Sequence, residues 1–304
     1  MNRSTIAAGV GGDAGWQALA WALEEAANTE SHLEICHVCP EDSPLASRTG
    51  TVPVGVLELA DPPLARAVAA AKARLGGNRV TLSARTGRVE SALLRVSDHA
   101  DLLVLGAGGR IAHQVAAHAK CPAVVVRPEA NVPRGPFAGH VVVGVDSSRP
   151  SQTALEFGFA YAAAHRRPLA AVHVISPDGG DLTEGDGIWL DGSASQPPTG
   201  ATAALAMLAT EVEPWTREYP PVAVKRAVLA DRPLPGLLRA GAGARLIVVG
   251  HRGHGPLARA MLGSVAHGLI EHATGPAAVT HMHDAHVSLF DGVVGYRELL
   301  RERA

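Results

Sequence analysis

The sequence predicts two tandem domains of the doubly wound α/β class, each built on a parallel sheet flanked by helices. Three observations lead to this fold class. The chain has 304 residues, which is long for one compact domain and comfortable for two of about 150. Apolar, valine-rich strand segments alternate with alanine-rich helical segments, a pattern typical of a parallel sheet covered on both faces. The same layout also occurs twice along the chain.

The first copy occupies residues 1–127 and contains five apolar strand segments. They are Thr5–Val10, Leu33–Cys39, Val80–Thr86, Leu102–Leu105 and Ala123–Val126. Helical segments are expected at 15–27, 62–75 and 89–99, with one more before Pro122. A polar insert containing proline and glycine follows the second strand.

The second copy occupies residues 140–283 and repeats this order. Its strand segments are His140–Val145, Leu169–Ile175, Val222–Leu229, Leu246–Val249 and Ala277–Thr280. Helical segments are expected at 151–164, 200–218 and 235–242, with a fourth beginning near Ser264. His37 of the first copy corresponds to His173 of the second. The repeat therefore accounts for nearly the whole chain.

Two segments lie outside the repeat. Residues 128–139 contain three prolines and two glycines, as expected of a linker. Residues 284–304 form a tail in which Val293, Tyr296, Leu299 and Leu300 have helical spacing. We expect this tail to pack as an amphipathic helix on one domain, with binding of a partner as the alternative.

Composition excludes several classes of protein. The formal net charge is −2 and the basic residues are scattered, which argues against nucleic-acid binding. No apolar run approaches the ~18 to 20 residues that span a bilayer, and the N-terminus lacks the pattern of a signal peptide. We therefore expect a cytoplasmic protein without a membrane segment.

Cysteine content agrees with a reducing compartment, because the chain has three cysteines, an odd number. Cys36 and Cys39 have the C-x-x-C spacing of redox or metal sites. They lie in a predicted strand, however, whereas redox pairs of this kind belong at helix N-termini. We expect them to be packing residues.

The segment 245–281 carries the main functional signal. An apolar strand ends at Gly250, Gly253 follows, and after nine further residues come Gly263 and Ser264 at the start of a predicted helix. Glycines let backbone N–H groups approach an anion closely, and a helix N-terminus adds partial positive charge. This pattern indicates a phosphate site.

The pattern Gly-x2-Gly-x9-Gly-Ser after an apolar strand resembles the ATP-binding signature of the universal stress protein family. Two tandem copies of this layout resemble the double-domain members of that family. The resemblance implies a five-stranded parallel sheet in each domain, with strand order 3-2-1-4-5. It also implies a regulatory protein of the stress response that binds ATP together with Mg²⁺.

The resemblance places the nucleotide in the second domain. Asp146 would accept hydrogen bonds from the ribose hydroxyls, with the alternative that it caps the following helix. Val145 and Val174 would contact adenine, and Val249 and Gly250 would approach the sugar and first phosphate. Phosphate contacts are expected from the backbone of Gly253, Gly263, Ser264 and Val265. Arg252, His254 and Arg259 lie in or near the same loop, where each could pair with phosphate or remain solvated, and Arg252 is counted among the predicted site residues.

The first domain departs from this pattern at each critical position. Gly11 stands where the second copy has Asp146. Gly106 and Pro122 are 16 residues apart, whereas the matching Gly250 and Pro276 are 26 apart, so ten residues of the loop are missing. We expect no ATP binding here. The alternative is a smaller anion held by Arg110 and the helix terminus.

Catalysis is not expected, although slow ATP hydrolysis stays open. The chain has no G-x-x-x-x-G-K-[ST] motif, and nothing places a carboxylate beside His251 or His254. His281, His283 and His286 could suit a divalent metal, but exposed histidines at a strand end are the preferred interpretation. We therefore expect no catalytic and no metal site.

Two further questions concern partners. A rival interpretation is a scaffold that no longer depends on nucleotide. In the family the final strands of each domain pair at the sheet edge, so the two copies would form a pseudo-dimer within one chain, and whole chains could dimerise further. The protein partner that would sense the bound nucleotide is not identified by the sequence.

Overall fold

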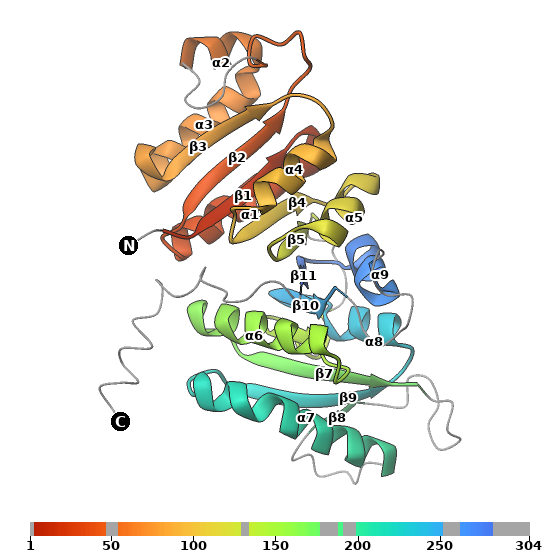
Figure 1. Cartoon of the computed structure of the whole chain (residues 1–304). Helices are drawn as coiled ribbons and strands as arrows, with labels where there is room; N and C mark the ends of the chain where they lie inside the picture. The colour runs from red at the N-terminus through yellow and green to blue at the C-terminus, as the bar shows by residue number, and fades with distance from the viewer. Residues whose placement is uncertain are drawn as a thin grey trace. The chain divides into compact units, whose positions relative to one another are not determined.

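The computed structural model describes residues 3–46, 54–128, 134–176, 188–190, 199–251 and 262–281. They divide into two compact units, the first ending at Arg127 and the second beginning at Pro128. The predicted C-terminal helix in 284–304 lies outside the described residues. Each unit is an α/β layer structure (Figure 1).

The first unit contains a five-stranded parallel sheet. Its strands are β1 (Thr5–Val10), β2 (His32–Val38), β3 (Val80–Arg85), β4 (Leu102–Gly106) and β5 (Ala123–Val126). Their order is β3-β2-β1-β4-β5, and every pairing within the unit is parallel. This confirms the expected order 3-2-1-4-5.

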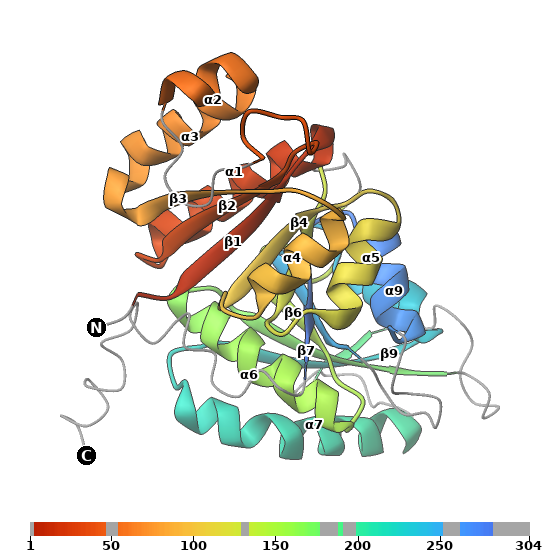
Figure 2. The same cartoon turned by 45° about the horizontal axis from the view of Figure 1, so that its top comes forward.

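Helices cover both faces of this sheet. They are α1 (Gly12–Asn28), α2 (Val54–Ala60), α3 (Pro62–Leu75), α4 (Val89–Ser97) and α5 (Gly109–His118), with a short 3-10 turn at Gly77–Arg79. Figure 2 shows α4 and α5 packed together on one face, with α1 behind the sheet. Helix α2, which lies in the polar insert and packs on α3, was not predicted from the sequence.

The second unit repeats this arrangement with one addition. Its strands are β6 (Val141–Gly144), β7 (Leu169–Ile175), β8 (Ile188–Leu190), β9 (Val224–Ala230), β10 (Leu246–Gly250) and β11 (Ala277–Thr280). The order is β11-β10-β6-β7-β9-β8. The strands other than β8 are parallel and follow the expected 3-2-1-4-5 order, read from the opposite edge.

Strand β8 is the addition, because it pairs antiparallel with β9 at the edge of the sheet. It comes from the polar insert, for which no strand was expected. The helices of this unit are α6 (Arg149–Ala164), α7 (Thr199–Glu218), α8 (Pro233–Ala240) and α9 (Ser264–His272). Of these, α6 and α7 pack against each other, and α8 packs against α9.

Two glycines bring helix N-termini close to the sheet. A Cβ atom on Gly106 would overlap the carbonyl oxygen of Ala14 in α1, and one on Gly250 would overlap that of Pro150 in α6. Any larger residue would push the helix away from the strand end. Both glycines thus shape the carboxyl edges of the sheets, where α/β proteins bind their ligands.

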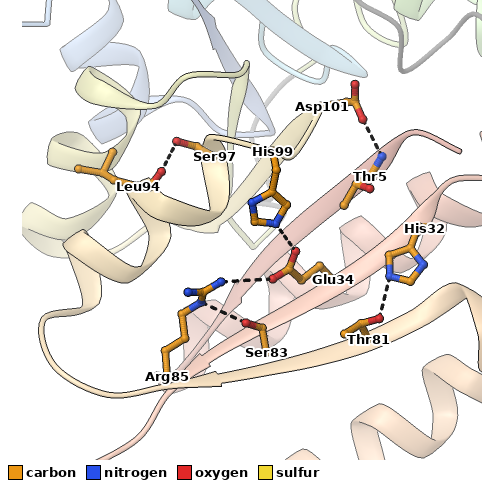
Figure 3. Close-up of polar contacts among 10 residues, drawn as sticks. All are labelled: Thr5, His32, Glu34, Thr81, Ser83, Arg85, Leu94, Ser97, His99 and Asp101. Atoms are coloured by element: carbon orange, nitrogen blue, oxygen red, sulfur yellow. Dashed lines mark hydrogen bonds and ion pairs between the residues drawn. The ribbon is translucent and has the colours of Figure 1, made fainter. Parts of the chain in front are cut away.

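A buried carboxylate in the first unit has a complete set of polar partners (Figure 3). Glu34 of β2 is 8% exposed. Its Oε2 lies 2.8 Å from His99 Nε2, and its Oε1 lies 3.9 Å from Arg85 Nη2. Arg85 also donates from Nε to Ser83 Oγ at 3.1 Å. These contacts offset the cost of removing the carboxylate from water, so we assign the cluster to the fold.

The C-x-x-C pair is buried in the same unit. Cys36 is 1% exposed and Cys39 is 4% exposed, and both are free thiols. Cys36 lies within β2 and Cys39 directly after it, not at a helix N-terminus. This agrees with the predicted packing role.

Candidate functional site

The sequence-predicted site residues of the second unit gather at the carboxyl edge of its sheet. β6 is the central strand, with β10 on one side and β7 on the other. The chain moves outward from β6 in both directions, so the winding reverses here, and open α/β folds bind ligands at such a point. Val145 follows β6, Val174 lies near the end of β7, and Val249 and Gly250 end β10.

Asp146 is held by the residue two positions later. Its Oδ1 accepts from the backbone N–H of Ser148 at 3.1 Å and from the Ser148 hydroxyl at 2.5 Å. Ser147 between them has a φ of 60°, a left-handed conformation that turns the chain back on itself. The carboxylate is therefore fixed, half-buried, at the strand end.

Ser148, and not Asp146, caps α6. The Ser148 hydroxyl accepts from the N–H of Ser151 at 3.3 Å, as an N-cap side chain does. The alternative in which Asp146 caps the helix is thus wrong. Asp146 lies outside the helix and accepts a hydrogen bond from the hydroxyl of the capping residue, Ser148.

Val145 has both backbone groups engaged. Its N–H donates to the carbonyl of Val172 at 2.9 Å, and its carbonyl oxygen lies 2.7 Å from His173 Nδ1. Its side chain is 3% exposed. A carbonyl oxygen has two lone pairs, so a second donor could still bind there. Val174, further along β7, is half-buried.

Backbone hydrogen bonds join His251, which follows β10, to Gly263, which precedes α9, and to Thr280 of β11. His251 donates its N–H to the carbonyl of Thr280 at 2.7 Å, and Gly263 donates to the carbonyl of His251 at 3.0 Å. The Gly263 N–H, predicted as a phosphate donor, therefore already has a protein acceptor. This closure brings the start of α9 back to the end of β10.

The N-terminus of helix α9 presents backbone donors. Gly263 is its N-cap residue and provides no side-chain cap. The first N–H groups of a helix have no acceptor within it. Ser264 is exposed and Val265 half-buried, so this terminus can present N–H groups and a hydroxyl to an anion.

Several predicted residues lie outside the described ranges. Arg252 and Gly253 belong to the loop between His251 and residue 262, as do His254 and Arg259. Of the histidine group considered for a metal, His283 and His286 also lie outside. His281 is 9% exposed, and its ring centroid lies 4.9 Å from that of His251. The expectation that His281 is exposed was wrong.

A second carboxylate, which the sequence analysis missed, is buried at the end of β9. Asp231 is 6% exposed. Its Oδ2 lies 3.0 Å from Arg239 Nη2, and its Oδ1 accepts from the N–H of Arg232 at 2.7 Å. The available signal was the same as for Asp146, an aspartate directly after an apolar strand. The Arg239 contact depends on α8 and could not be read from spacing.

The corresponding edge of the first unit is different. β4 ends at Gly106 and α5 begins at Gly109, whereas β10 ends at Gly250 and α9 begins at Ser264. The N-cap of α5 is Gly108, two residues after the end of β4, whereas the N-cap of α9 is Gly263. The first unit therefore has only a short turn in place of the loop.

A family model described as the universal stress protein family matches residues 2–127 and 138–281. The chain belongs to this family. Universal stress protein Rv2005c of Mycobacterium tuberculosis is 33% identical over 230 residues, which cover 71% of this chain and 75% of that protein. Universal stress protein Rv2623 of the same organism is 34% identical over 198 residues, covering 62% and 63%.

The fold is that of solved universal stress proteins. The crystal structure of one from Archaeoglobus fulgidus superposes with a TM-score of 0.61 at 13% identity, covering 93% of this chain and all of the other. The chain is thus a tandem universal stress protein, as the two family matches require. Among the described residues, no helix combines the length and apolar character needed to cross a bilayer.

Proposed function

We propose that this universal stress protein is an ATP-binding regulator in the cytoplasm, with one nucleotide site at the carboxyl edge of the second unit. The observation that carries the proposal is the meeting of two features at that edge. A fixed aspartate carboxylate follows β6, and a helix with no side-chain cap begins after the loop that follows β10. Together they provide acceptors for a sugar and donors for phosphate.

The ribose would be held by Asp146. One carboxylate oxygen accepts two hydrogen bonds from Ser148, which orients the group before any ligand arrives. Ribose hydroxyls donate well to a carboxylate because charge-assisted hydrogen bonds are the stronger kind. Adenine would lie between the ends of β6 and β7, against Val145 and Val174. The sugar and first phosphate would pass over Val249 and Gly250.

The phosphates would be held by the loop and the start of α9. N–H groups of Ser264 and Val265, the Ser264 hydroxyl and the partial positive charge of the helix end suit an anion. Gly253 and Arg252 complete the set, whereas the Gly263 N–H, which donates to the carbonyl of His251, would contribute only as a shared donor. Mg²⁺ would accompany the phosphates and neutralise part of their charge. We assign no side chain of this protein to the metal.

Regulation is favoured over catalysis. The described part of the site offers hydrogen-bond donors and one carboxylate that is already engaged by Ser148, but no arrangement of a base against an attacking water. Bound ATP would stabilise one conformation or association state of the second unit, which a protein partner then senses. The first unit, with Gly11 and a short β4–α5 turn, would bind no ATP.

Calorimetric titration of the full chain with Mg·ATP tests this proposal. We expect one ATP per chain, and we expect Asp146→Ala and Gly253→Ala each to weaken binding at least 10-fold. Mass spectrometry of gently purified protein should detect adenine nucleotide. Absence of nucleotide, together with binding unaffected by both substitutions, would leave the nucleotide-independent scaffold as the better interpretation.

A variant of the first unit serves as the matched control. Gly11→Asp restores the carboxylate at the position of Asp146, and the φ of Gly11, 171°, is open to any residue. We expect the stoichiometry to stay at one, because the phosphate loop is still missing. Two ATP molecules per wild-type chain would contradict the asymmetry of the two units.

A further inference from the structure

The first unit contains a cavity of about 220 Å³ where its strands β1 and β4 end. It occupies the edge of the sheet that corresponds to the nucleotide site proposed for the second unit. Residues from three strands and three helices line it, among them Val10, Val38, Val89, Leu93, Leu105 and Ile111. The cavity lies wholly within the first unit.

The side chains that line this cavity are apolar. Every residue that forms it is aliphatic, a glycine or Cys36, and none carries a charge. Burial raises the pKa of the Cys36 thiol to about 11, so this group is neutral at physiological pH. The carbonyl oxygen of Val10 is already engaged by His37 Nδ1 at 3.1 Å. A triphosphate would find no charged partner among the lining residues, and a buried charge without a partner is costly.

Two changes from the second unit create this space. A Cβ atom on Gly11 would meet nothing within 4 Å, so the absent carboxylate leaves open room. The short β4–α5 turn then brings Ile111 and Ala112 to the strand ends, where they line the cavity. Ile111 is 37% exposed, which is unusual for a large aliphatic residue and places it at the entrance.

We propose that this cavity is a second ligand site, which binds a small uncharged apolar molecule about the size of two fused rings. An apolar cavity of about 150 Å³ takes up benzene, and this one is somewhat larger. The lining side chains favour contact with apolar surface and offer no charged partner to a phosphate. The loss of nucleotide chemistry in the first unit has thus produced a pocket of different specificity.

Indole, an uncharged bicyclic compound, is the probe for the experiment. Calorimetric titration of the full chain should show saturable binding of one indole, with ATP binding unchanged. In methyl NMR spectra the signals of Val10, Leu93 and Leu105 should shift. Gly11→Leu and Ala112→Leu should each weaken indole binding at least 10-fold, because both add side-chain volume at the cavity wall.

A matched control is Gly55→Leu in α2, where a Cβ atom likewise meets nothing within 4 Å but the residue does not line this cavity. We expect its affinity for indole to equal that of the wild type. Gly11 is an extended N-cap residue, whereas Ala112 lies within a helix. Leucine at these two positions would therefore disturb the fold in different ways, so a loss of indole binding in both variants indicates filling of the cavity.

Three results would overturn the inference. They are no saturable indole binding to the wild type, undiminished binding to both filled variants, or binding of adenosine at this edge in preference to indole. The outcome is independent of the proposed function. Failure of Asp146→Ala to alter ATP binding would refute the nucleotide site and leave the apolar pocket standing.

Discussion

The Nδ1 atom of His173 lies 2.7 Å from the carbonyl oxygen of Val145, the residue that precedes the ribose-binding aspartate proposed above. Since a carbonyl oxygen only accepts, Nδ1 carries the proton. The first unit repeats the contact, with His37 Nδ1 3.1 Å from the carbonyl oxygen of Val10. The contact persists where the aspartate is replaced by Gly11. It therefore supports the fold in both units, and in the second it also positions Asp146.

Replacing this histidine should separate the two roles. His173→Phe keeps a planar ring but removes the donor, so we expect a loss of about 1 kcal/mol in the free energy of unfolding. We also expect ATP affinity to fall several-fold, because the strand end that carries Asp146 is less well fixed. Urea unfolding and calorimetric titration would measure the two effects.

The matched control is His37→Phe. It should cost a similar free energy of unfolding while leaving ATP affinity at the wild-type value. His37 also lies 3.8 Å from Asp61, a half-exposed ion pair of the kind that contributes little. Equal losses of ATP affinity in both variants would show that the effect on binding is not local.

Ser148 links the helix cap to the proposed ribose acceptor. Ser148→Ala removes the N-cap of α6 and the hydroxyl that donates to Asp146. We expect it to lower the free energy of unfolding by about 1 kcal/mol and to weaken ATP binding. Ser148→Thr retains the hydroxyl and should restore most of both. If the threonine variant is as impaired as the alanine variant, the hydroxyl is not what matters.

Gly250 should tolerate no side chain. A Cβ atom there would overlap the carbonyl oxygen of Pro150, so Gly250→Ala must displace α6 from β10. Overpacking of this kind costs about 1–3 kcal/mol, and ATP affinity should fall with it. Urea unfolding monitored by circular dichroism would measure the loss of stability.

The same substitution at Gly200 is the control. This residue lies in the first turn of α7, where a Cβ atom meets nothing within 4 Å. Alanine is the better helix former by up to about 1 kcal/mol, so Gly200→Ala should be neutral or slightly stabilising. If Gly200→Ala lowers the free energy of unfolding as much as Gly250→Ala does, the close contact between Gly250 and the Pro150 carbonyl is not the cause of the loss.

Local patterns were enough to predict most of the fold. Valine-rich segments marked the parallel strands because both faces of such strands are buried. Strand order came from the family resemblance, since alternation along the chain does not determine which strands are neighbours. The three residues of β8 were missed because so short a strand in a polar insert has no periodicity. Its existence depends on the exposed edge of β9.

The site was predictable where it depends on sequence-local features. Asp146 stood out as a carboxylate directly after an apolar strand. The alternative cap role of Asp146 was wrong by two residues, because Ser147 turns the chain in a left-handed conformation and Ser148 becomes the N-cap of α6. The contacts of His173 with Val145 and of Arg239 with Asp231 join segments that only the folded sheet brings together. No spacing rule could have supplied them.

The thiol of Cys36 should make the protein sensitive to alkaline pH. Burial is the main cause of its raised pKa, about 11, with Glu34 acting in the same direction and Arg85 against it. Because the pKa in the folded state is above the ordinary value of about 8.5, the contribution of this group to stability is complete below about pH 8.5. It is lost as pH rises towards 11.

Cys36→Val tests this dependence. The variant cannot ionise, so its stability should fall less than that of the wild type between about pH 8 and pH 10.5. The difference should reach on the order of 2 kcal/mol, as expected for a shift of this size. Urea unfolding at both pH values measures it, and all other ionisable groups are common to the two proteins. If both proteins lose the same free energy of unfolding, ionisation of the Cys36 thiol does not destabilise the fold. The wall of the cavity in the first unit would then be more polar than its lining side chains indicate.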